Sequence, residues 1–428
     1  MNALDGIRIL DCSRVLAGPW CTQTLADLGA DVVKVERPPG ASHPGGDDTR
    51  GWGPPFLRGR DGADTAEAAY YLGANRNKRS ITCDIAQPEG QALIRELAAK
   101  ADVFVENYKV GDMARYGLDF ASLHAINPKL VYCSITGFGQ TGPYAERAGY
   151  DLMIQAMSGM MSITGRADGE HGGGPQRAGV AITDVFTGIY ATSAILAAIE
   201  MRHRTGEGQH IDMALLDVGM AILANQAAGF INTGAEPQRM GNAHPSLVPY
   251  QDFPTADGAM LLAIGNDGQF ARFCAAAGRP EWAQDARFTT NTRRVEHRAT
   301  LVPLMSETTR TRTTAEWIAL LEDKAVPCGP INTLASAFAD PQVQARGLVK
   351  KQAVAPVNSA GVAPENIATG AAKGAAEICT VASPMRLSAA PVQLRYAPPA
   401  LGEHTTEVLR ELGLDAARIQ TLQQQGVV

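Results

Sequence analysis

Residues 7–37 read IRILDCSRVLAGPWCTQTLADLGADVVKVER, and this stretch decides the fold class. The apolar runs at 7–12 and 31–37 have the length and composition of buried strands, and 20–30 has the pattern of a helix that ends near Gly29. Two strands joined by such a helix predict a parallel pair with a right-handed crossover.

The same alternation continues along the first half of the chain. Apolar runs at 80–85, 102–108 and 130–136 predict three more strands, and 88–101 predicts a helix with a proline near its start. Strands that alternate with helices predict an α/β protein built on a parallel sheet.

The second half of the chain no longer alternates between apolar strands and helices. Residues 184–204 predict a long, alanine-rich helix, whose small side chains we expect to pack closely with the following segment 209–226 in a core or a subunit interface. Residues 241–278 predict a hairpin or small sheet followed by helices. The Ala- and Gly-rich stretch 357–377 predicts a surface loop, and the amphipathic tail 401–414 is expected to pack back on the first domain.

The length of 428 residues exceeds what one core usually serves, so two domains are expected. Residues 1–224 would form the first part of a large domain and 225–335 a small domain. Residues 336–428 would return to the large domain.

Composition narrows the class of ligand. A net charge of −6 provides no basic surface for nucleic acid, and seven scattered cysteines without a C-x-x-C motif indicate reduced thiols and no metal site. The first residues lack the pattern of a signal peptide, and no apolar run approaches the roughly 20 residues that span a bilayer. We therefore expect a cytoplasmic enzyme with a small ligand, and no nucleic-acid or membrane partner.

One motif suggests a different ligand. Residues 137–142, GFGQTG, match the dinucleotide fingerprint G-x-G-x-x-G directly after a predicted strand. The motif follows a late strand, Pro143 comes next, and no strand-ending acid stands about 20 residues further on. We therefore interpret the segment as a turn that requires glycine. An NAD-dependent oxidoreductase that uses GFGQTG stays the alternative function.

Basic and polar residues follow several predicted strands. Arg37 comes after Glu36 at the end of the second strand, the cluster 74–80 reads ANRNKRS, and Lys109 stands beyond the next strand. Guanidinium groups pair well with phosphate, so these residues together favour a phosphorylated nucleotide ligand other than NAD.

Several segments, taken in order, resemble the class III coenzyme A transferase family, of the formyl-CoA transferase and CaiB–BaiF type, which also contains α-methylacyl-CoA racemases. They are LDCSRVLAGPWCTQTLADLGADVVKVERPPG, NRNKRSITCD, ADVFVENYKVGDMARYGLD, INPKLVYCSITGFGQTGPYAERAGYD, SITGRADG, RTGEGQHIDMALLD and LGEHTTEVL. The resemblance implies a Rossmann-like large domain built from both chain ends, a smaller α+β domain, and a homodimer of interlocked rings. It also implies that coenzyme A and acyl-CoA are substrates and that no cofactor is permanently bound.

The resemblance further implies a set of CoA-binding residues. The matching positions are Val15, Ala17, Arg37, Asn77, Lys78, Asn107, Tyr108 and Arg115. Arg37 and Lys78 are the phosphate candidates, and the others are expected at adenine, ribose or pantetheine. Leu16 stands where transferases of the family often carry glutamine, so no polar contact to the acyl group is expected there.

The racemase branch is disfavoured by its own catalytic pair. Tyr150 occupies the position of the racemase histidine, and a phenol is a poor proton acceptor at neutral pH. Asp151 and Asp184 are retained, and we interpret them as structural acids that cap helices. An α-methylacyl-CoA racemase remains the alternative within the family.

The transferase branch needs a carboxylate nucleophile. Asp168 in TGRADG matches its position, while the extra residues EHGGG before Pro175 leave Glu170 as a second candidate. Attack on an acyl-CoA would give an aspartyl anhydride and then an aspartyl-CoA thioester, which a free carboxylic acid resolves. Loop 241–250 matches the family's lid but has fewer glycines, and His244 within it is a candidate substrate contact or a solvated loop histidine.

The donor and the acceptor are expected from similar relatives. The segments SITG and GVAITD around the site resemble those of members that use succinyl-CoA and a dicarboxylic acid. Oxalate–formate exchange and carnitine-type or aromatic acids stay open.

Overall fold

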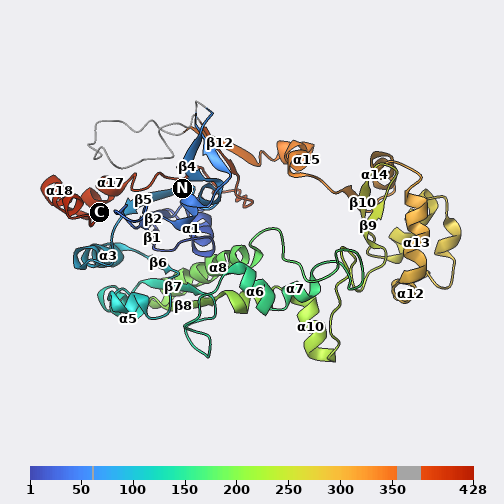
Figure 1. The fold of residues 1–428 in the computed structure, drawn as a ribbon, viewed down its shortest axis with the longest axis horizontal. Helices are drawn as coiled ribbons and strands as arrows, with labels where there is room; N and C mark the ends of the chain where they lie inside the picture. The colour runs from blue at the N-terminus through green and yellow to red at the C-terminus, as the bar shows by residue number, and fades with distance from the viewer. Residues whose placement is uncertain (60–61, 354–376) are drawn as a thin grey trace. The chain divides into compact units, whose positions relative to one another are not determined.

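The computed structural model describes residues 1–59, 62–353 and 377–428, and the chain divides into two compact units (Figure 1). Unit 1 comprises Met1–Ser158, Ala178–Ala228 and Arg346–Val428, and unit 2 comprises Gly159–Arg177 and Gly229–Ala345. Both chain ends belong to unit 1, as the resemblance implied. The boundaries at 224 and 335 stay a prediction.

A six-stranded parallel sheet forms the centre of unit 1 (Figure 1). Its spatial order is β5 (Lys78–Thr82), β2 (Asp31–Glu36), β1 (Arg8–Asp11), β6 (Val103–Glu106), β7 (Val131–Thr136) and β8 (His210–Ala214). Every neighbouring pair is parallel. This is the doubly wound order of a Rossmann-like fold, so the predicted fold class is confirmed.

Strand β8 was not predicted. Its five residues lie in the segment 209–226, which we expected to continue the packing of the preceding helix. β8 is one of the two edge strands, and most of its side chains alternate between exposed and partly buried. A short alternating run next to a long helical pattern carries a weak signal.

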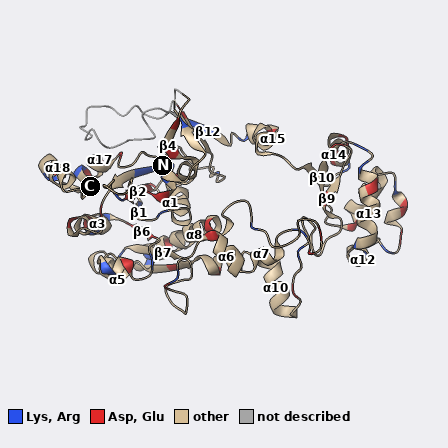
Figure 2. Ribbon diagram, in the orientation of Figure 1, with Lys and Arg blue, Asp and Glu red and all other residues tan. Residues whose placement is uncertain are grey.

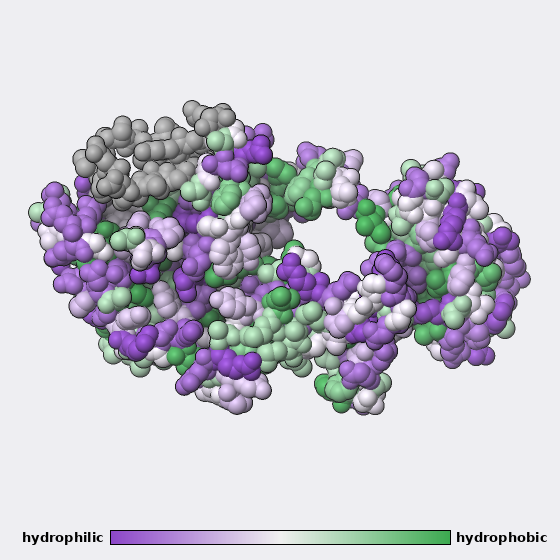
Figure 3. All heavy atoms as spheres, viewed as in Figure 1, coloured by the Kyte–Doolittle hydropathy of each residue, from purple (hydrophilic) through white to green (hydrophobic). Residues whose placement is uncertain are grey.

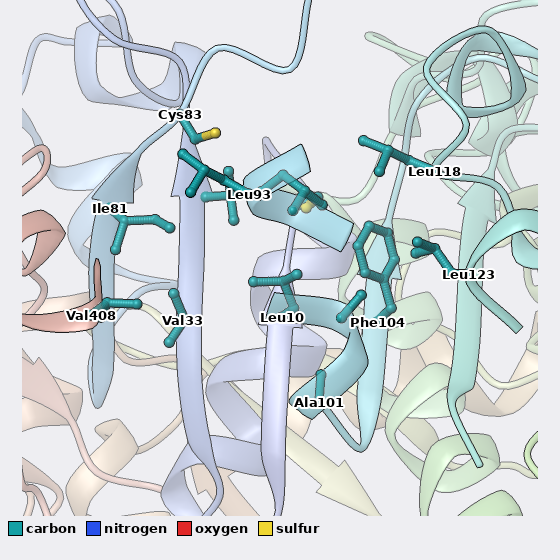
Figure 4. Packing of buried hydrophobic residues seen from close by; sticks show 14 of the residues in the cluster. Leu10, Val33, Ile81, Cys83, Leu93, Ala101, Phe104, Leu118, Leu123 and Val408 are labelled. Atoms are coloured by element: carbon teal, nitrogen blue, oxygen red, sulfur yellow. The ribbon is translucent and has the colours of Figure 1, made fainter. Parts of the chain in front are cut away.

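Helices cover both faces of the sheet. On one face, α1 (Ala17–Asp27) and α8 (Ile182–Thr205) pack on Ile9, Val32 and Val131. On the other face lie α3 (Pro88–Lys100), α5 (Phe120–Ile126), α17 (Thr405–Leu412) and α18 (Ala416–Gln424). Figure 4 shows this second face, where Leu10, Val33, Ile81 and Phe104 from the strands meet Leu93, Leu123 and Val408 from the helices. Ile9 and Leu10 therefore point to opposite faces, as expected for successive strand residues.

Helix α8 is long and apolar enough to cross a bilayer by length and composition. The sequence led us to expect no apolar run long enough to span a bilayer, and α8 differs from that expectation. Half of its apolar window is buried in unit 1, and Ile195 and Ile199 belong to the core. It approaches α1 so closely that a Cβ at Gly188 would lie 2.7 Å from the Ala17 carbonyl oxygen. α8 is thus a core helix of this unit.

Shorter elements complete unit 1. They are η1 (Asp48–Gly51), β3 (Phe56–Arg58), β4 (Asp64–Ala68), α2 (Ala69–Leu72), α4 (Asp112–Arg115), α6 (Asp151–Met157), α9 (Leu215–Ala221), β12 (Val349–Ala353) and β13 (Glu377–Val381). α10 (Ala224–Thr233) spans the boundary between the units. The tail packs on the sheet as predicted, because Thr82 N donates to Thr405 Oγ1. Of the predicted surface loop 357–377, all but Glu377 lies outside the described residues.

Unit 2 contains a three-stranded antiparallel sheet in the order β11 (Cys328–Pro330), β10 (Ala259–Ala263) and β9 (Tyr250–Pro254). Its helices are α7 (Met160–Ile163), α11 (Asp267–Ala276), η2 (Pro280–Ala283), α12 (Asn291–Glu296), α13 (Arg298–Thr309), α14 (Thr314–Asp323), α15 (Leu334–Ala339) and α16 (Pro341–Ala345). Phe253, Phe273 and Trp317 are buried in its core. The predicted small sheet followed by helices is confirmed.

Candidate active site

The sheet order reverses at β1, and this switch point creates a crevice at the carboxyl ends of β1 and β6. The loops that leave these strands are joined by one side chain. Asn107 Oδ1 accepts from Arg14 N at 2.8 Å, and its Nδ2 donates to Arg14 O at 2.7 Å. A small-molecule ligand is expected here in a doubly wound sheet.

A cavity of about 490 Å³ occupies the crevice. Its walls include the predicted CoA contacts Val15, Ala17, Asn107, Tyr108 and Arg115. A neighbouring cavity of about 680 Å³ contains the exposed Arg37 beyond the end of β2. The two cavities share Arg14, Tyr108 and Asp112, so they form one extended surface along the carboxyl edge of the sheet.

Val15 lies in the left-handed region at φ 71°. A β-branched residue there is strained by roughly 1–2 kcal/mol and persists only where its surroundings impose it. Its N–H donates to Asp47 Oδ1 at 3.2 Å, which holds the first loop in this shape. The backbone of Val15 is therefore placed at the cavity wall by a tertiary contact.

Two of the predicted CoA residues, Lys78 and Asn77, have buried side chains that bond within the chain and line neither of the two cavities. Lys78 is fully buried, and its Nζ donates to Asp11 Oδ2, Pro19 O and Asn75 Oδ1 at 2.9–3.0 Å. All three ammonium donors are used, so this side chain has none left for a phosphate. Every residue of β5 is buried although β5 is an edge strand, because the C-terminal segment packs against it: Asn77 N donates to Tyr396 O, and Thr82 N donates to Thr405 Oγ1.

Asn77 is equally enclosed, with 1% of its surface exposed. Its Nδ2 donates to Asp27 Oδ1 and Gln393 O, and its Oδ1 accepts from Arg395 N and Tyr396 N. This amide ties the returning C-terminal segment to the rest of unit 1. The side-chain amide of Asn77 therefore has a structural role, and its contact with CoA stays a prediction.

Lys78 belongs to a network of buried charges beside the loop that follows β1. Figure 2 marks where basic and acidic residues lie along the chain. Burial alone would raise the pKa of Asp11, but Lys78 and Lys34 outweigh it and lower that pKa to about 2. Burial lowers the pKa of Lys78 to about 8 against the pull of Asp11. Both groups are charged at neutral pH, and Lys34 adds a hydrogen bond to Ser13 O at 2.9 Å. The network holds the turn that leads to Val15.

Asp151 and Asp184, the two acids that this chain shares with the racemases, lie in different environments. Asp151 accepts from Thr183 N at 2.9 Å and from Gln155 Nε2 at 2.6 Å, so it supports the first turn of α8 as a structural acid. Burial and the neighbouring Asp151 raise the pKa of Asp184 to about 7, and Asp184 lines the 490 Å³ cavity. Tyr150 is exposed at the same wall.

The GFGQTG segment forms a turn after β7, and the next helix is α6, which begins only at Asp151. Gly137 faces Gly149 so closely that a Cβ on it would lie 2.5 Å from the Gly149 Cα. Gln140 N donates to the Asp212 carboxylate at 3.0 Å. The helix that carries a pyrophosphate in a dinucleotide site does not follow this turn.

The candidate nucleophile loop lies in unit 2. Its two limbs approach at Gly165, where a Cβ would lie 2.3 Å from Gly174 O and φ is +120°. Gln176 N donates to Thr164 O at 2.9 Å and closes the loop. Asp168 stands at the exposed end, with 75% of its side chain accessible. Glu170 is exposed two residues later.

Arg239 is the residue that sequence reasoning missed. Its Nη2 donates to Asp168 Oδ1, and its Nη1 donates to Ser162 O at 2.9 Å. Two residues further on, Gly241 N donates to Gly165 O at 2.9 Å, so the predicted lid loop 241–250 starts beside the nucleophile loop. His244 Nδ1 accepts from Ser246 N at 3.0 Å. No local spacing links an arginine to an aspartate so far away in sequence.

Comparison with known proteins identifies the family of this chain. The model of CoA-transferase family III matches residues 4–405. Succinate–glutarate CoA-transferase of Agrobacterium fabrum is 50% identical over 96% of this chain and 95% of its own length. Human succinyl-CoA:glutarate CoA-transferase is 43% identical over 100% of this chain and 90% of its own length. The crystal structure of a CaiB/BaiF family protein from Brucella suis superposes with a TM-score of 0.79 at 47% identity, covering 96% of this chain and 100% of the other. The chain therefore belongs to CoA-transferase family III and is an enzyme that moves coenzyme A between an acyl-CoA and a carboxylic acid.

Proposed function

We propose that this enzyme transfers coenzyme A from succinyl-CoA to a short dicarboxylic acid such as glutarate, with Asp168 as the nucleophile. The names of the relatives from Agrobacterium fabrum and Homo sapiens support this pair of acids. The observation that carries the nucleophile assignment is the Asp168 carboxylate itself, which stands exposed at the end of a glycine-shaped loop. Glu170 lacks any ion pair within the described residues and stays the second candidate.

The reaction proceeds by four substitutions at carbonyl carbons. Asp168 attacks the thioester carbon of the donor, a C–O bond forms, the C–S bond breaks, and CoA leaves as a thiolate. The thiolate attacks Cγ of Asp168 in the anhydride and expels the donor acid as a carboxylate. The acceptor carboxylate then attacks the aspartyl thioester, and the thiolate returns to the acceptor's acyl carbon. One thioester replaces another, so the enzyme must mainly exclude water from its acyl intermediates.

Coenzyme A would lie along the carboxyl edge of the sheet in unit 1. The exposed guanidinium of Arg37 is suited to a CoA phosphate, since arginine binds phosphate through two parallel hydrogen bonds. Val15, Ala17, Asn107, Tyr108 and Arg115 line the adjoining cavity and would contact the rest of the molecule.

We further propose that the protein is a homodimer. Phe186, Ile189 and Tyr190 on α8 are each at least 40% exposed, and apolar side chains gather over α6 and α8 in Figure 3. Exposed apolar patches of this kind mark interaction sites in soluble proteins. A second copy of the chain would cover this face.

The nucleophile is tested by Asp168→Asn beside the matched control Glu170→Gln. Exchange between succinyl-CoA and a panel of free acids is followed for both variants. Asp168→Asn should lower kcat by at least about 10³-fold while CoA still raises the melting temperature, because the covalent step is lost and binding in unit 1 is kept. Glu170→Gln should stay within about threefold. Near-native turnover of Asp168→Asn would exclude Asp168 as the nucleophile.

A further inference from the structure

We propose that Arg239 is a catalytic residue that stabilises the negative charge on Oδ1 of Asp168 whenever Cγ of Asp168 is attacked. The inference rests on the function proposed above. It assigns different roles to the two carboxylate oxygens, since Oδ1 is held by Arg239 and Oδ2 is the attacking atom.

The geometry of the pair supports this division. Arg239 is anchored within unit 2, because its Nη1 donates to Ser162 O at 2.9 Å and only 13% of its side chain is exposed. Its Nη2 points at Oδ1 of Asp168. Within the described residues, Oδ2 of Asp168 accepts no hydrogen bond, and the side chain is 75% exposed. A guanidinium is always charged, so one oxygen faces a permanent cation and the other is open to a substrate.

Stability does not explain the pair. An ion pair with one highly exposed partner contributes about 0–1 kcal/mol. The Nε of Arg239 is buried and makes no hydrogen bond within the described residues, which costs stability rather than adding to it. A partly buried arginine in this arrangement is therefore better explained by what its Nη2 does during the reaction.

Arg239 acts when the CoA thiolate attacks Cγ of Asp168 in the anhydride. In the anhydride, Oδ1 is the carbonyl oxygen of Asp168, and Oδ2 bridges to the acyl group. When the CoA thiolate attacks Cγ, the electron pair of the Cγ=Oδ1 bond moves to Oδ1. The pair returns as the Cγ–Oδ2 bond breaks, and the donor acid leaves with Oδ2. A positively charged donor beside Oδ1 lowers the energy of this tetrahedral state.

The same charge develops once more in the second half of the reaction. The acceptor carboxylate attacks Cγ of the aspartyl thioester, Oδ1 becomes negative, and the thiolate leaves. In the other two substitutions the attacked carbon belongs to the donor or the acceptor, and the charge develops on the substrate's own oxygen. Arg239 therefore assists the two steps centred on Asp168 and not the two centred on the substrates.

The test separates these steps by omitting the acceptor. Protein is mixed with an acyl-CoA that supports exchange, and samples are quenched over time. In one set free CoA is measured with a thiol reagent added after the quench, and in the other the CoA adduct on peptide 164–177 is measured by mass spectrometry. The wild-type protein should form the adduct and release the donor acid. Arg239→Gln should still release CoA, because CoA leaves in the first attack, and water then hydrolyses the anhydride to the donor acid and the Asp168 carboxylate. It should form the adduct about 10²–10³-fold more slowly. Arg239→Lys should recover part of this rate because it restores the charge.

Arg287→Gln is the matched control. It removes another arginine–aspartate pair of unit 2, Arg287 with Asp285 at 2.7 Å, and should leave adduct formation within about twofold. Melting temperatures and circular dichroism verify that all variants are folded.

Each outcome is decisive. An adduct formed at the wild-type rate in Arg239→Gln overturns the inference and leaves the proposed function intact. Loss of CoA release together with the adduct in this variant also overturns it, because Arg239 would then be needed for the first attack. Exchange by the wild-type protein without any adduct on Asp168 removes the proposed nucleophile, and the role of Arg239 falls with it.

Discussion

Replacing Lys78 by methionine distinguishes a buried structural cation from a phosphate ligand. The side chain is fully buried, and its ammonium donates to Asp11, Pro19 and Asn75. Lys78→Met leaves the Asp11 carboxylate in the interior without this partner. We therefore expect a large loss of stability in unit 1.

The magnitude follows from the remaining partners of Asp11. Removing one member of a buried ion pair costs about 3–5 kcal/mol. Asp11 keeps its hydrogen bonds from Ser13 N and Thr22 Oγ1 and the charge of Lys34, so the lower end, about 3 kcal/mol, is expected here. For a unit of roughly 300 residues, whose unfolding entropy is about 2.1 cal/mol/K per residue, that corresponds to a fall in melting temperature of about 5 °C.

The assay is thermal unfolding with and without CoA, and Arg37→Gln is the matched variant. Arg37 is exposed at the 680 Å³ cavity, so its loss should weaken CoA binding by about tenfold and change the melting temperature by no more than about 1 °C. Adding Asp11→Asn to Lys78→Met should recover about 1 kcal/mol or more, because the uncompensated charge is removed. A Lys78→Met protein with native melting temperature and weakened CoA binding would refute the interior assignment.

Three further predictions test the cavity, the nucleophile loop and the dimer. Burial and the neighbouring Asp151 give Asp184 a folded-state pKa of about 7, above its unfolded value, so its stabilising contribution is present below about pH 4 and lost as the pH rises through 7. In urea titrations the stability of Asp184→Asn relative to wild type should rise by about 2–3 kcal/mol from pH 5 to pH 8, because about two pH units at roughly 1.4 kcal/mol each separate pH 5 from that pKa. An equal difference at both pH values would contradict this. Gly173→Ala places a Cβ 2.3 Å from Ala167 O and should lower kcat by about tenfold or more without changing the melting temperature. Gly229→Ala, whose Cβ meets no atom within 4 Å among the described residues, should leave kcat unchanged. Light scattering should give a dimer mass that Ile189→Glu reduces to a monomer, and a monomeric wild-type protein would contradict the proposed assembly.

The sheet was predictable because its signals are local. The run 7–12 alternates between two covered faces, and Ile9 and Leu10 indeed enter different cores. Buried central strands have continuous apolar runs, which a reader of the sequence finds easily. The edge strand β8 is only partly buried, so its pattern was weak and it was missed.

The site was predictable in part. Loops after parallel strands meet at one edge of the sheet, and this rule together with the family resemblance brought Val15, Asn107 and Tyr108 to one cavity. This rule places a residue near an edge of the sheet, but it does not predict whether its side chain is exposed or buried. Lys78 stands in a basic cluster that resembles a phosphate site, and only the packing of β5 within the sheet places it in the interior.

Five of the six strands of the large sheet, the first crossover and the glycine-rich loop that carries Asp168 could be predicted from local sequence, because they depend on apolar periodicity and backbone freedom among near neighbours. Which charges are buried, and that Arg239 pairs with Asp168, follows only from the tertiary structure. Arg239 is 71 residues away from Asp168 in sequence, and Lys78 is 67 residues away from Asp11. Pairs at such separations form only when the chain has closed on itself, and the burial that sets their strength arises in the same event.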